Sequence, residues 1–195
     1  MPVPKGATLD PARTRAAILE SVTATLYEHG LDGIGIAALC SEAGISKETL
    51  YRHFGSKDGL ISEVLRIRSD RTFRWISDAV ESAGDDPARQ LAAVFDALGR
   101  WYAEPGFRGC AIMNAASQHH AKPVSTIARR HLSRYLDLLT SIAHRAGAHD
   151  PSATGRQLLM LLEGATVVAD HHRKSHAARD ARVAALILLA HAGHG

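Results

Sequence analysis

Residues 33–60 read GIGIAALCSEAGISKETLYRHFGSKDGL, and this stretch decides the fold. Apolar residues recur at helical spacing over its first half, until Gly44 interrupts the pattern. Ser46 is a favourable N-cap for a second short helix, whose inward-facing residues are Leu50 and Phe54. Two short helices joined by a turn that contains glycine form the helix-turn-helix pattern.

The second short helix carries polar side chains on the face opposite Leu50 and Phe54. An α-helix fits the major groove of B-DNA, where residues near its N-terminus reach base edges. Thr49 can contact a thymine methyl group or exchange hydrogen bonds with a base, and Arg52 can reach guanine or a phosphate. Residues suited to phosphate contacts flank them, namely Lys47, Tyr51, His53 and Lys57. A merely solvated helix face would carry similar residues, so this pattern alone leaves both interpretations open.

Outward from this stretch, apolar periodicity and Gly or Pro breaks predict further helices. Asp10 and Pro11 suit the start of a first helix, and Gly30 suits its end. Beyond Ser56, helices are expected over about 57–83, 87–103, 109–119, 124–146, 152–172 and 177–192. Because no strand alternation or repeat is present, we expect an all-α fold of about nine helices. The predicted domains are a three-helix helix-turn-helix domain over 1–56 and a helical ligand-binding and dimerisation domain over 57–195, linked by the 57–83 helix.

Composition bounds the class of protein. The chain has 195 residues, of which 46% are hydrophobic and 22% charged, as in ordinary globular proteins. It has no membrane-length apolar run and no apolar signal core near its N-terminus, so we expect a cytoplasmic protein without a membrane partner. Two distant cysteines in a reducing compartment argue against a disulfide. The net charge of +3 permits nucleic-acid binding without locating it.

Residues 35–60 closely resemble the signature of the TetR family. The matching elements are Leu39, Ala43-Gly44-Ile45-Ser46, Thr49-Leu50-Tyr51, His53-Phe54, Ser56-Lys57 and Leu60. Gly35 stands where the family usually has a Thr or Ser cap, and Cys40 where Ala is usual. The resemblance implies that Tyr51, His53 and Lys57 contact phosphates and that Thr49 faces bases. The expected DNA-binding residues are Gly35, Ser46, Lys47, Thr49, Tyr51, Arg52, His53 and Lys57.

The resemblance also implies a small-molecule pocket in the C-terminal half. Residues 104–118 look like a motif of one TetR subgroup, with Gln118 where an acidic residue is common. Aromatic, apolar and amide side chains suit such a site. The expected pocket residues are Trp75, Trp101, Tyr102, Phe107, Cys110, Met113, Asn114 and Gln118. Plain core packing is the alternative for each of them.

Cofactors and metals are not expected. Cys110 as a redox switch would need a lowered pKa, and a small buried apolar side chain fits it better. The histidine groups His119-His120 and His171-His172 with His176 lack the spacing of a known metal site. A redox- or metal-responsive regulator of the same fold stays as the alternative.

The last two helices are apolar nearly all round, so both of their sides must be buried. We expect the second side to face the same pair in another copy, giving a two-fold homodimer. The expected interface residues are Leu158, Leu162, Ala165, Ala169, Val183, Leu186, Ile187 and Ala190. A monomeric core made by the same helices is the alternative.

The sequence therefore predicts a ligand-responsive transcriptional repressor. As a dimer it would bind a near-palindromic operator in double-stranded DNA, and a small, largely apolar effector would release it. No nucleophile elbow, phosphate loop or metalloprotease motif is present, so an enzyme is not expected. An effector-independent DNA-binding protein is a less favoured alternative, and an activator of the same fold is another alternative.

Overall fold

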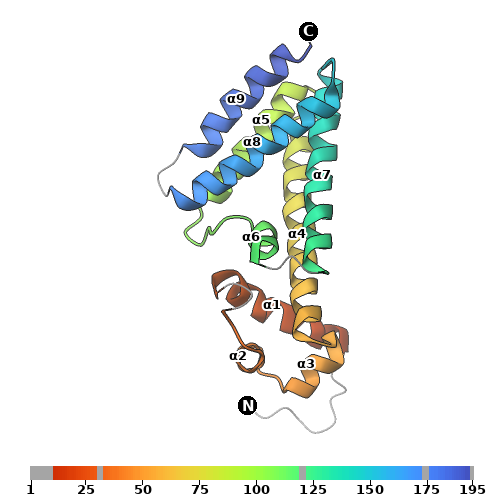
Figure 1. Cartoon of the computed structure of the whole chain (residues 1–195), viewed down its shortest axis with the longest axis vertical. Coiled ribbons are helices and arrows are strands. Elements are labelled where there is room, and N and C mark those ends of the chain that lie inside the picture. The colour runs from red at the N-terminus through yellow and green to blue at the C-terminus, as the bar shows by residue number, and fades with distance from the viewer. Residues whose placement is uncertain (1–10, 30–32, 119–121, 173–175, 194–195) are drawn as a thin grey trace. The chain divides into compact units, whose positions relative to one another are not determined.

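A computed structural model describes residues 11–29, 33–118, 122–172 and 176–193. Within these ranges the fold is all-α, as predicted, and has nine helices (Figure 1). Their bounds are α1 (Pro11–His29), α2 (Ile36–Glu42), α3 (Lys47–Phe54), α4 (Lys57–Ser82), α5 (Pro87–Tyr102), α6 (Ala111–Gln118), α7 (Val124–Arg145), α8 (Pro151–His171) and α9 (Ala177–His191). The six helices predicted beyond Ser56 begin and end within two residues of the predicted bounds. The predicted Asp10 cap and Gly30 terminator lie outside the described residues.

The chain divides into two compact units, Met1–Ile67 and Arg68–Gly195. We expected the first domain to end at residue 56, before the linking helix. The boundary instead falls inside α4, eleven residues later. Leu60, Ile61 and Val64 on the first turns of α4 are buried, so this part of the helix completes the core of the first unit.

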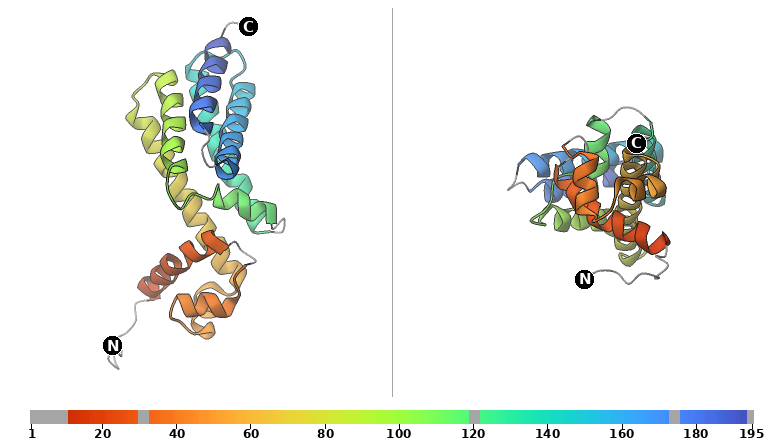
Figure 2. Two further views of the ribbon diagram at one scale, coloured as in Figure 1. Left: turned by 90° about the vertical axis from the view of Figure 1, so that its left-hand side faces the viewer. Right: turned by 90° about the horizontal axis from the view of Figure 1, so that it is seen from below.

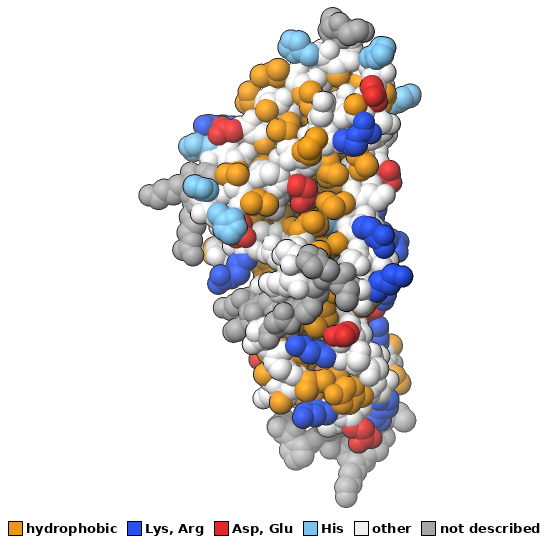
Figure 3. All heavy atoms as spheres, in the orientation of Figure 1, with side chains coloured by type: hydrophobic (Ala, Val, Ile, Leu, Met, Phe, Trp, Pro, Cys, Tyr) orange, Lys and Arg blue, Asp and Glu red, His pale blue; other side chains and the backbone are white. Residues whose placement is uncertain are grey.

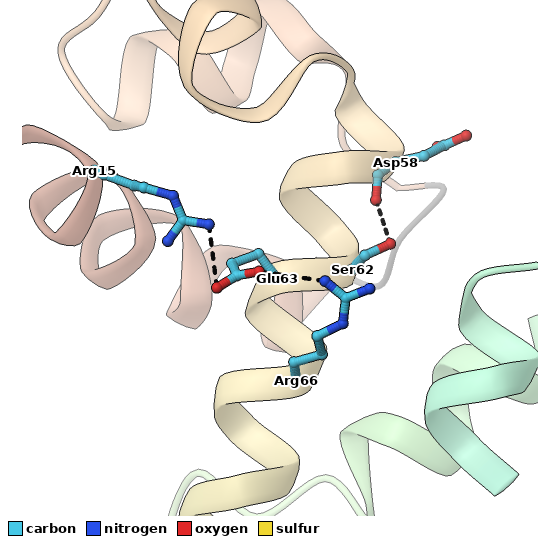
Figure 4. A network of polar contacts seen from close by, with 5 residues as sticks. All are labelled: Arg15, Asp58, Ser62, Glu63 and Arg66. Atoms are coloured by element: carbon cyan, nitrogen blue, oxygen red, sulfur yellow. Dashed lines mark hydrogen bonds and ion pairs between the residues drawn. The ribbon is translucent and has the colours of Figure 1, made fainter. Parts of the chain in front are cut away.

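The first unit is built around the apolar face of α1. Ile18 and Val22 are fully buried there, as are Leu39 of α2 and Leu50 of α3. Polar contacts link α1 to the start of α4, as Figure 4 shows. The Glu63 carboxylate lies 3.1 Å from the Arg15 guanidinium and 3.5 Å from that of Arg66 on its own helix. These pairs are partly solvent-exposed, so apolar burial is the main stabilising contribution.

The second unit packs α5, α7, α8 and α9 around one apolar core, and Figure 2 gives two further views of these helices. Phe95 and Leu91 of α5, Leu139 of α7 and Leu158 of α8 are completely buried in it. Asp86 and Asp150 cap α5 and α8 through their carboxylates, each followed by a proline in the first helical turn. At Gly155, a Cβ would collide with the Thr140 hydroxyl, so glycine lets α7 and α8 approach closely.

Among the described residues, none of the helices combines the length and the apolarity needed to span a bilayer.

Candidate functional site

The turn between α2 and α3 has a defined backbone geometry. Gly44 has φ +63°, a left-handed conformation that side chains rarely adopt. The Gly44 N–H donates to the Ser41 carbonyl at 3.1 Å, and the Ile45 N–H donates to the Cys40 carbonyl at 3.0 Å. This pair of bonds is the Schellman motif, which ends a helix by satisfying its last carbonyls. Gly44 therefore fixes the direction in which α3 leaves α2.

Ser46 caps α3, as predicted from its sequence position. Its hydroxyl accepts a hydrogen bond from the Thr49 backbone N–H at 3.1 Å and lies 3.0 Å from the Thr49 hydroxyl. The Arg52 guanidinium in turn donates to the Thr49 hydroxyl at 3.3 Å. A chain of polar groups thus follows one face of α3 and restricts the rotamers of Thr49 and Arg52.

The expected DNA-binding side chains are accessible. Ser46, Lys47 and Arg52 are exposed, and Tyr51 exposes 46% of its surface. The remaining side chains of the set are partly buried, namely Thr49, His53 and Lys57. Inward, Leu50 is fully buried, while Phe54 is only partly buried under the Arg15 guanidinium, 5.1 Å from the ring centroid. Gly35 is exposed and caps α2 without a side-chain hydrogen bond, as its lack of a side chain requires.

Lys57 is held close to α3 by a tight connection. Gly55 ends α3 with φ +73°, and the Ser56 hydroxyl accepts from the Gly59 N–H at 2.9 Å to cap α4. A Cβ at Gly59 would collide with the Phe54 carbonyl, so only glycine lets the first turn of α4 pack on the end of α3. This close approach was not predicted from the sequence.

In the second unit, three of the expected pocket residues form an aromatic group. The Phe107 ring packs edge-on against Trp101, with centroids 4.9 Å apart, and lies 5.0 Å from Tyr102. All three are partly buried, as is Met113. Among the described residues, no aromatic contact joins Trp75 to this group. Trp75 packs against the core of the unit, as Trp101 and Tyr102 also do.

Two of the expected pocket residues lie at the surface. The exposed Asn114 side chain donates to the Arg108 carbonyl at 2.8 Å, which fixes the loop before α6. Gln118 is exposed at the end of α6. These two residues therefore lie outside the interior in this structure.

Cys110 belongs to a buried polar chain that the sequence analysis did not anticipate. His131 Nε2 lies 3.6 Å from the Cys110 sulfur, and His131 Nδ1 lies 2.9 Å from the Ser69 hydroxyl. Burial lowers the pKa of His131 to about 4 and raises that of the Cys110 thiol to about 11. Cys110 is therefore a protonated thiol at neutral pH, which disfavours the redox-sensing alternative. The sequence does contain a signal for these buried polar contacts. His131 is a polar residue at helical spacing within an otherwise mainly apolar stripe, formed by Ile127, Tyr135 and Leu139.

A second polar group joins α5 to α8. The Tyr102 hydroxyl lies 2.8 Å from the Thr166 hydroxyl, and Thr166 donates to the Leu162 carbonyl at 3.0 Å. One helical turn before Thr166, Glu163 is partly buried, and its burial raises the pKa of its carboxyl to about 6. Neither Glu163 nor Thr166 was predicted from the sequence as a functional residue.

Large apolar side chains are exposed on α8 and α9. Figure 3 shows hydrophobic side chains spread over these two helices. Large exposed members are Met160 (64% exposed), Val167 (56%), Val168 (45%), Val183 (50%) and Ile187 (56%). We call these five residues the α8/α9 face.

The predicted interface residues differ in how much of each is exposed within one chain. Leu158, Leu162 and Ala165 are at most 6% exposed, because they pack into the core of their own unit. Ala169 and Leu186 are half-buried, while Val183, Ile187 and Ala190 are exposed. Side chains buried within their own chain offer little surface to a second copy, whereas the exposed members of the predicted set and the α8/α9 face are accessible.

No three His, Cys, Asp or Glu side chains in the described ranges lie close enough together to hold a metal ion. His171, His172 and His176 are exposed near the ends of α8 and α9, and His119 and His120 lie outside those ranges.

Comparison with known proteins gives consistent matches. The model of "Bacterial regulatory proteins, tetR family" matches residues 18–64, which cover α2, α3 and the start of α4. The HTH-type transcriptional regulator BetI of Stenotrophomonas maltophilia is 32% identical over 45% of this chain and 44% of its own length. The HTH-type transcriptional repressor KstR2 of Mycobacterium tuberculosis is 30% identical over 56% and 48%. The chain thus spans about half the length of these curated relatives.

Structural similarity extends over nearly the whole chain. The crystal structure of SCO4454, a TetR-family transcriptional regulator from Streptomyces coelicolor, superposes with a TM-score of 0.82 and 30% sequence identity. The match covers 93% of this chain and 97% of that one. The similarity therefore includes the C-terminal helices as well as the helix-turn-helix.

Proposed function

Because the chain belongs to the TetR family of bacterial regulatory proteins, we propose that it represses transcription by binding an operator as a homodimer and leaves the operator when a small effector binds. The family's regulators bind DNA through the helix-turn-helix and are not enzymes. Binding chromosomal DNA would place the protein in the cytoplasm. KstR2, one of the relatives, is named as a transcriptional repressor, which supports repression rather than activation.

The observation that carries the DNA-binding proposal is the capped, accessible face of α3. Its first turns carry Thr49 and Arg52, whose side chains are already bonded to each other at 3.3 Å. A prearranged pair loses less rotamer entropy on binding than two free side chains. We assign Thr49 and Arg52 to base edges in the major groove.

The other polar side chains of the set position α3 on the duplex. Lys47, Tyr51, His53 and Lys57 lie on or next to α3, and we assign them to phosphates. Ser46 acts through its cap on the α3 backbone. Gly35 has no side chain to cap α2, so the first backbone amides of that helix stay accessible, and we assign them to a phosphate.

The α8/α9 face supports the homodimer. Large exposed aliphatic side chains gathered on two adjacent helices are uncommon on a monomer surface. Their burial against the same face of a second copy would make a four-helix bundle with two-fold symmetry. Such symmetry presents two α3 helices to successive major grooves and requires a near-palindromic operator.

The interior of the second unit supports an effector site. The aromatic group of Trp101, Tyr102 and Phe107 lies beside polar groups on α8, and this mixture suits a small organic ligand. An effector releases the operator only if it binds the DNA-free conformation more tightly than the DNA-bound one.

Selection from random DNA duplexes tests the proposal. We expect wild-type protein to enrich one sequence with two-fold symmetry. A Thr49→Ala variant should enrich an altered sequence, whereas a Glu81→Gln variant, changed at an exposed position on α4, should enrich the wild-type sequence. A wild-type selection that enriches no common sequence contradicts the proposal.

A further inference from the structure

Glu163 is a partly buried carboxylate of the second unit, and no counter-charge acts on it. It lies on α8, and among the described residues no hydrogen bond or ion pair reaches it. Removal from water is the cause that raises the pKa of its carboxyl to about 6, so it is still mostly ionised at neutral pH. A partly buried, ionised and unpaired carboxylate costs free energy in the ligand-free protein.

Ionisable groups from three other parts of the unit lie within electrostatic range of this charge. It is close enough to Tyr102 of α5, Tyr135 of α7 and Cys110 before α6 to help raise the pKa of each. The Tyr102 hydroxyl and Thr166, 2.8 Å apart, lie one helical turn along α8 from Glu163. Glu163 therefore lies on α8 one turn from the point where Tyr102 of α5 contacts that helix.

Aromatic rings adjoin the same place. Tyr102 is in contact with Phe107 and Trp101, with ring centroids 5.0 Å and 5.9 Å away. Ring faces and a carboxylate both attract positive charge, and together they are the usual components of sites for organic ammonium ions. An anionic ligand would be repelled here.

We propose, on the basis of the effector role proposed above, that the effector is an organic cation: an ammonium group recognised by Glu163 and attached to an apolar body that packs against Trp101, Tyr102 and Phe107. A metal ion fits less well, because the described residues form no group of three metal-ligating side chains that includes this carboxylate. The charge on the ligand supplies the partner that Glu163 lacks in the free protein.

Binding of a matched pair of probes tests this assignment. Benzyltrimethylammonium carries the positive charge, and neopentylbenzene has the same shape with carbon in place of nitrogen. Tryptophan fluorescence reports binding, since Trp101 lies in the aromatic group. We expect the cation to bind wild-type protein about tenfold more tightly than the neutral compound or better.

Variants separate the charge from the fold. Glu163→Gln should abolish the preference for the cation while leaving the affinity for neopentylbenzene within about twofold, since only the charge–charge contribution is lost. Glu81→Gln, the same change at an exposed position of α4, should keep the wild-type preference. Glu163→Gln removes an unpaired charge, so it should unfold at no lower urea concentration than wild type at neutral pH, which shows that it folds.

Three results would overturn the assignment. They are equal affinity of wild-type protein for both probes, no saturable binding of the cation at millimolar concentration, and a cation preference that persists in Glu163→Gln. Operator binding without probes is measured in parallel. Normal operator binding with any of these results rejects the cationic effector alone, whereas loss of operator binding in wild-type protein rejects the regulator proposal itself.

Discussion

His131 predicts an acid-sensitive second unit. The imidazole is 2% exposed, and its burial, assisted by the nearby Arg134, lowers its pKa from 6.5 to about 4. The unfolded chain therefore takes up a proton below about pH 6.5, whereas the folded chain does not until about pH 4. Because the unfolded state binds more protons in this window, the free energy of unfolding falls as pH falls.

The magnitude follows from the size of the shift. A difference of 2.5 units between 6.5 and 4, at about 1.4 kcal/mol per unit, gives about 3 kcal/mol lost across the window. Glu163 acts in the opposite direction, since its pKa is raised to about 6 and its protonation favours the folded state. The contribution of His131 is therefore isolated as the difference between wild type and a His131→Gln variant.

The assay is urea unfolding at several pH values from about 7 to 4.5, followed by tryptophan fluorescence at fixed protein concentration. Trp75 and Trp101 both lie in the second unit, so the signal reports that unit. We expect the wild-type free energy of unfolding to fall toward acid more steeply than that of His131→Gln. His144→Gln, at an exposed position of the same helix, should follow wild type. If the free energy of unfolding depends on pH in the same way for wild type and His131→Gln, the reasoning is refuted.

Three further predictions concern folding and assembly. Gly59→Ala should destabilise the first unit by about 1–3 kcal/mol, measured by circular dichroism during urea unfolding, because its Cβ meets the Phe54 carbonyl; unchanged stability contradicts the close approach. Ser46→Ala should cost about 1 kcal/mol in the same assay through loss of the α3 cap. Ile187→Asp should give monomers by light scattering while Ser133→Asp, exposed on α7, stays dimeric; a dimeric Ile187→Asp places the interface elsewhere.

The helices and the helix-turn-helix could be predicted because local chemistry determines them. Gly44 ends α2 with a left-handed backbone, and Ser46 caps α3, whatever the rest of the chain does. Asp86-Pro87 and Asp150-Pro151 mark the starts of α5 and α8 in the same way. Such signals need only a few neighbouring residues, so a single sequence contains them.

The interior and the surface of the second unit could not be predicted equally well. A helix that is apolar all round does not indicate which side meets its own core, and so Leu158 and Leu162 were assigned to the interface although they are buried in the protomer. The Tyr102–Thr166 and Cys110–His131 contacts depend on how distant helices pack. Asn114 was predicted to line a pocket because its side chain is polar. In the structure that side chain donates a hydrogen bond to the nearby Arg108 carbonyl and so stabilises the loop before α6.

The central claim is that α3 reads DNA sequence, and one measurement tests it most directly. It is the ratio of affinities for the selected operator and for a scrambled duplex, determined at one salt concentration for wild type, Arg52→Ala and Lys57→Ala. We predict that Arg52→Ala lowers this ratio by about five- to a hundredfold, because a base contact is lost. Lys57→Ala should weaken binding to both duplexes alike and leave the ratio unchanged. A ratio that Arg52→Ala does not alter, with a wild-type ratio near one, would contradict the claim.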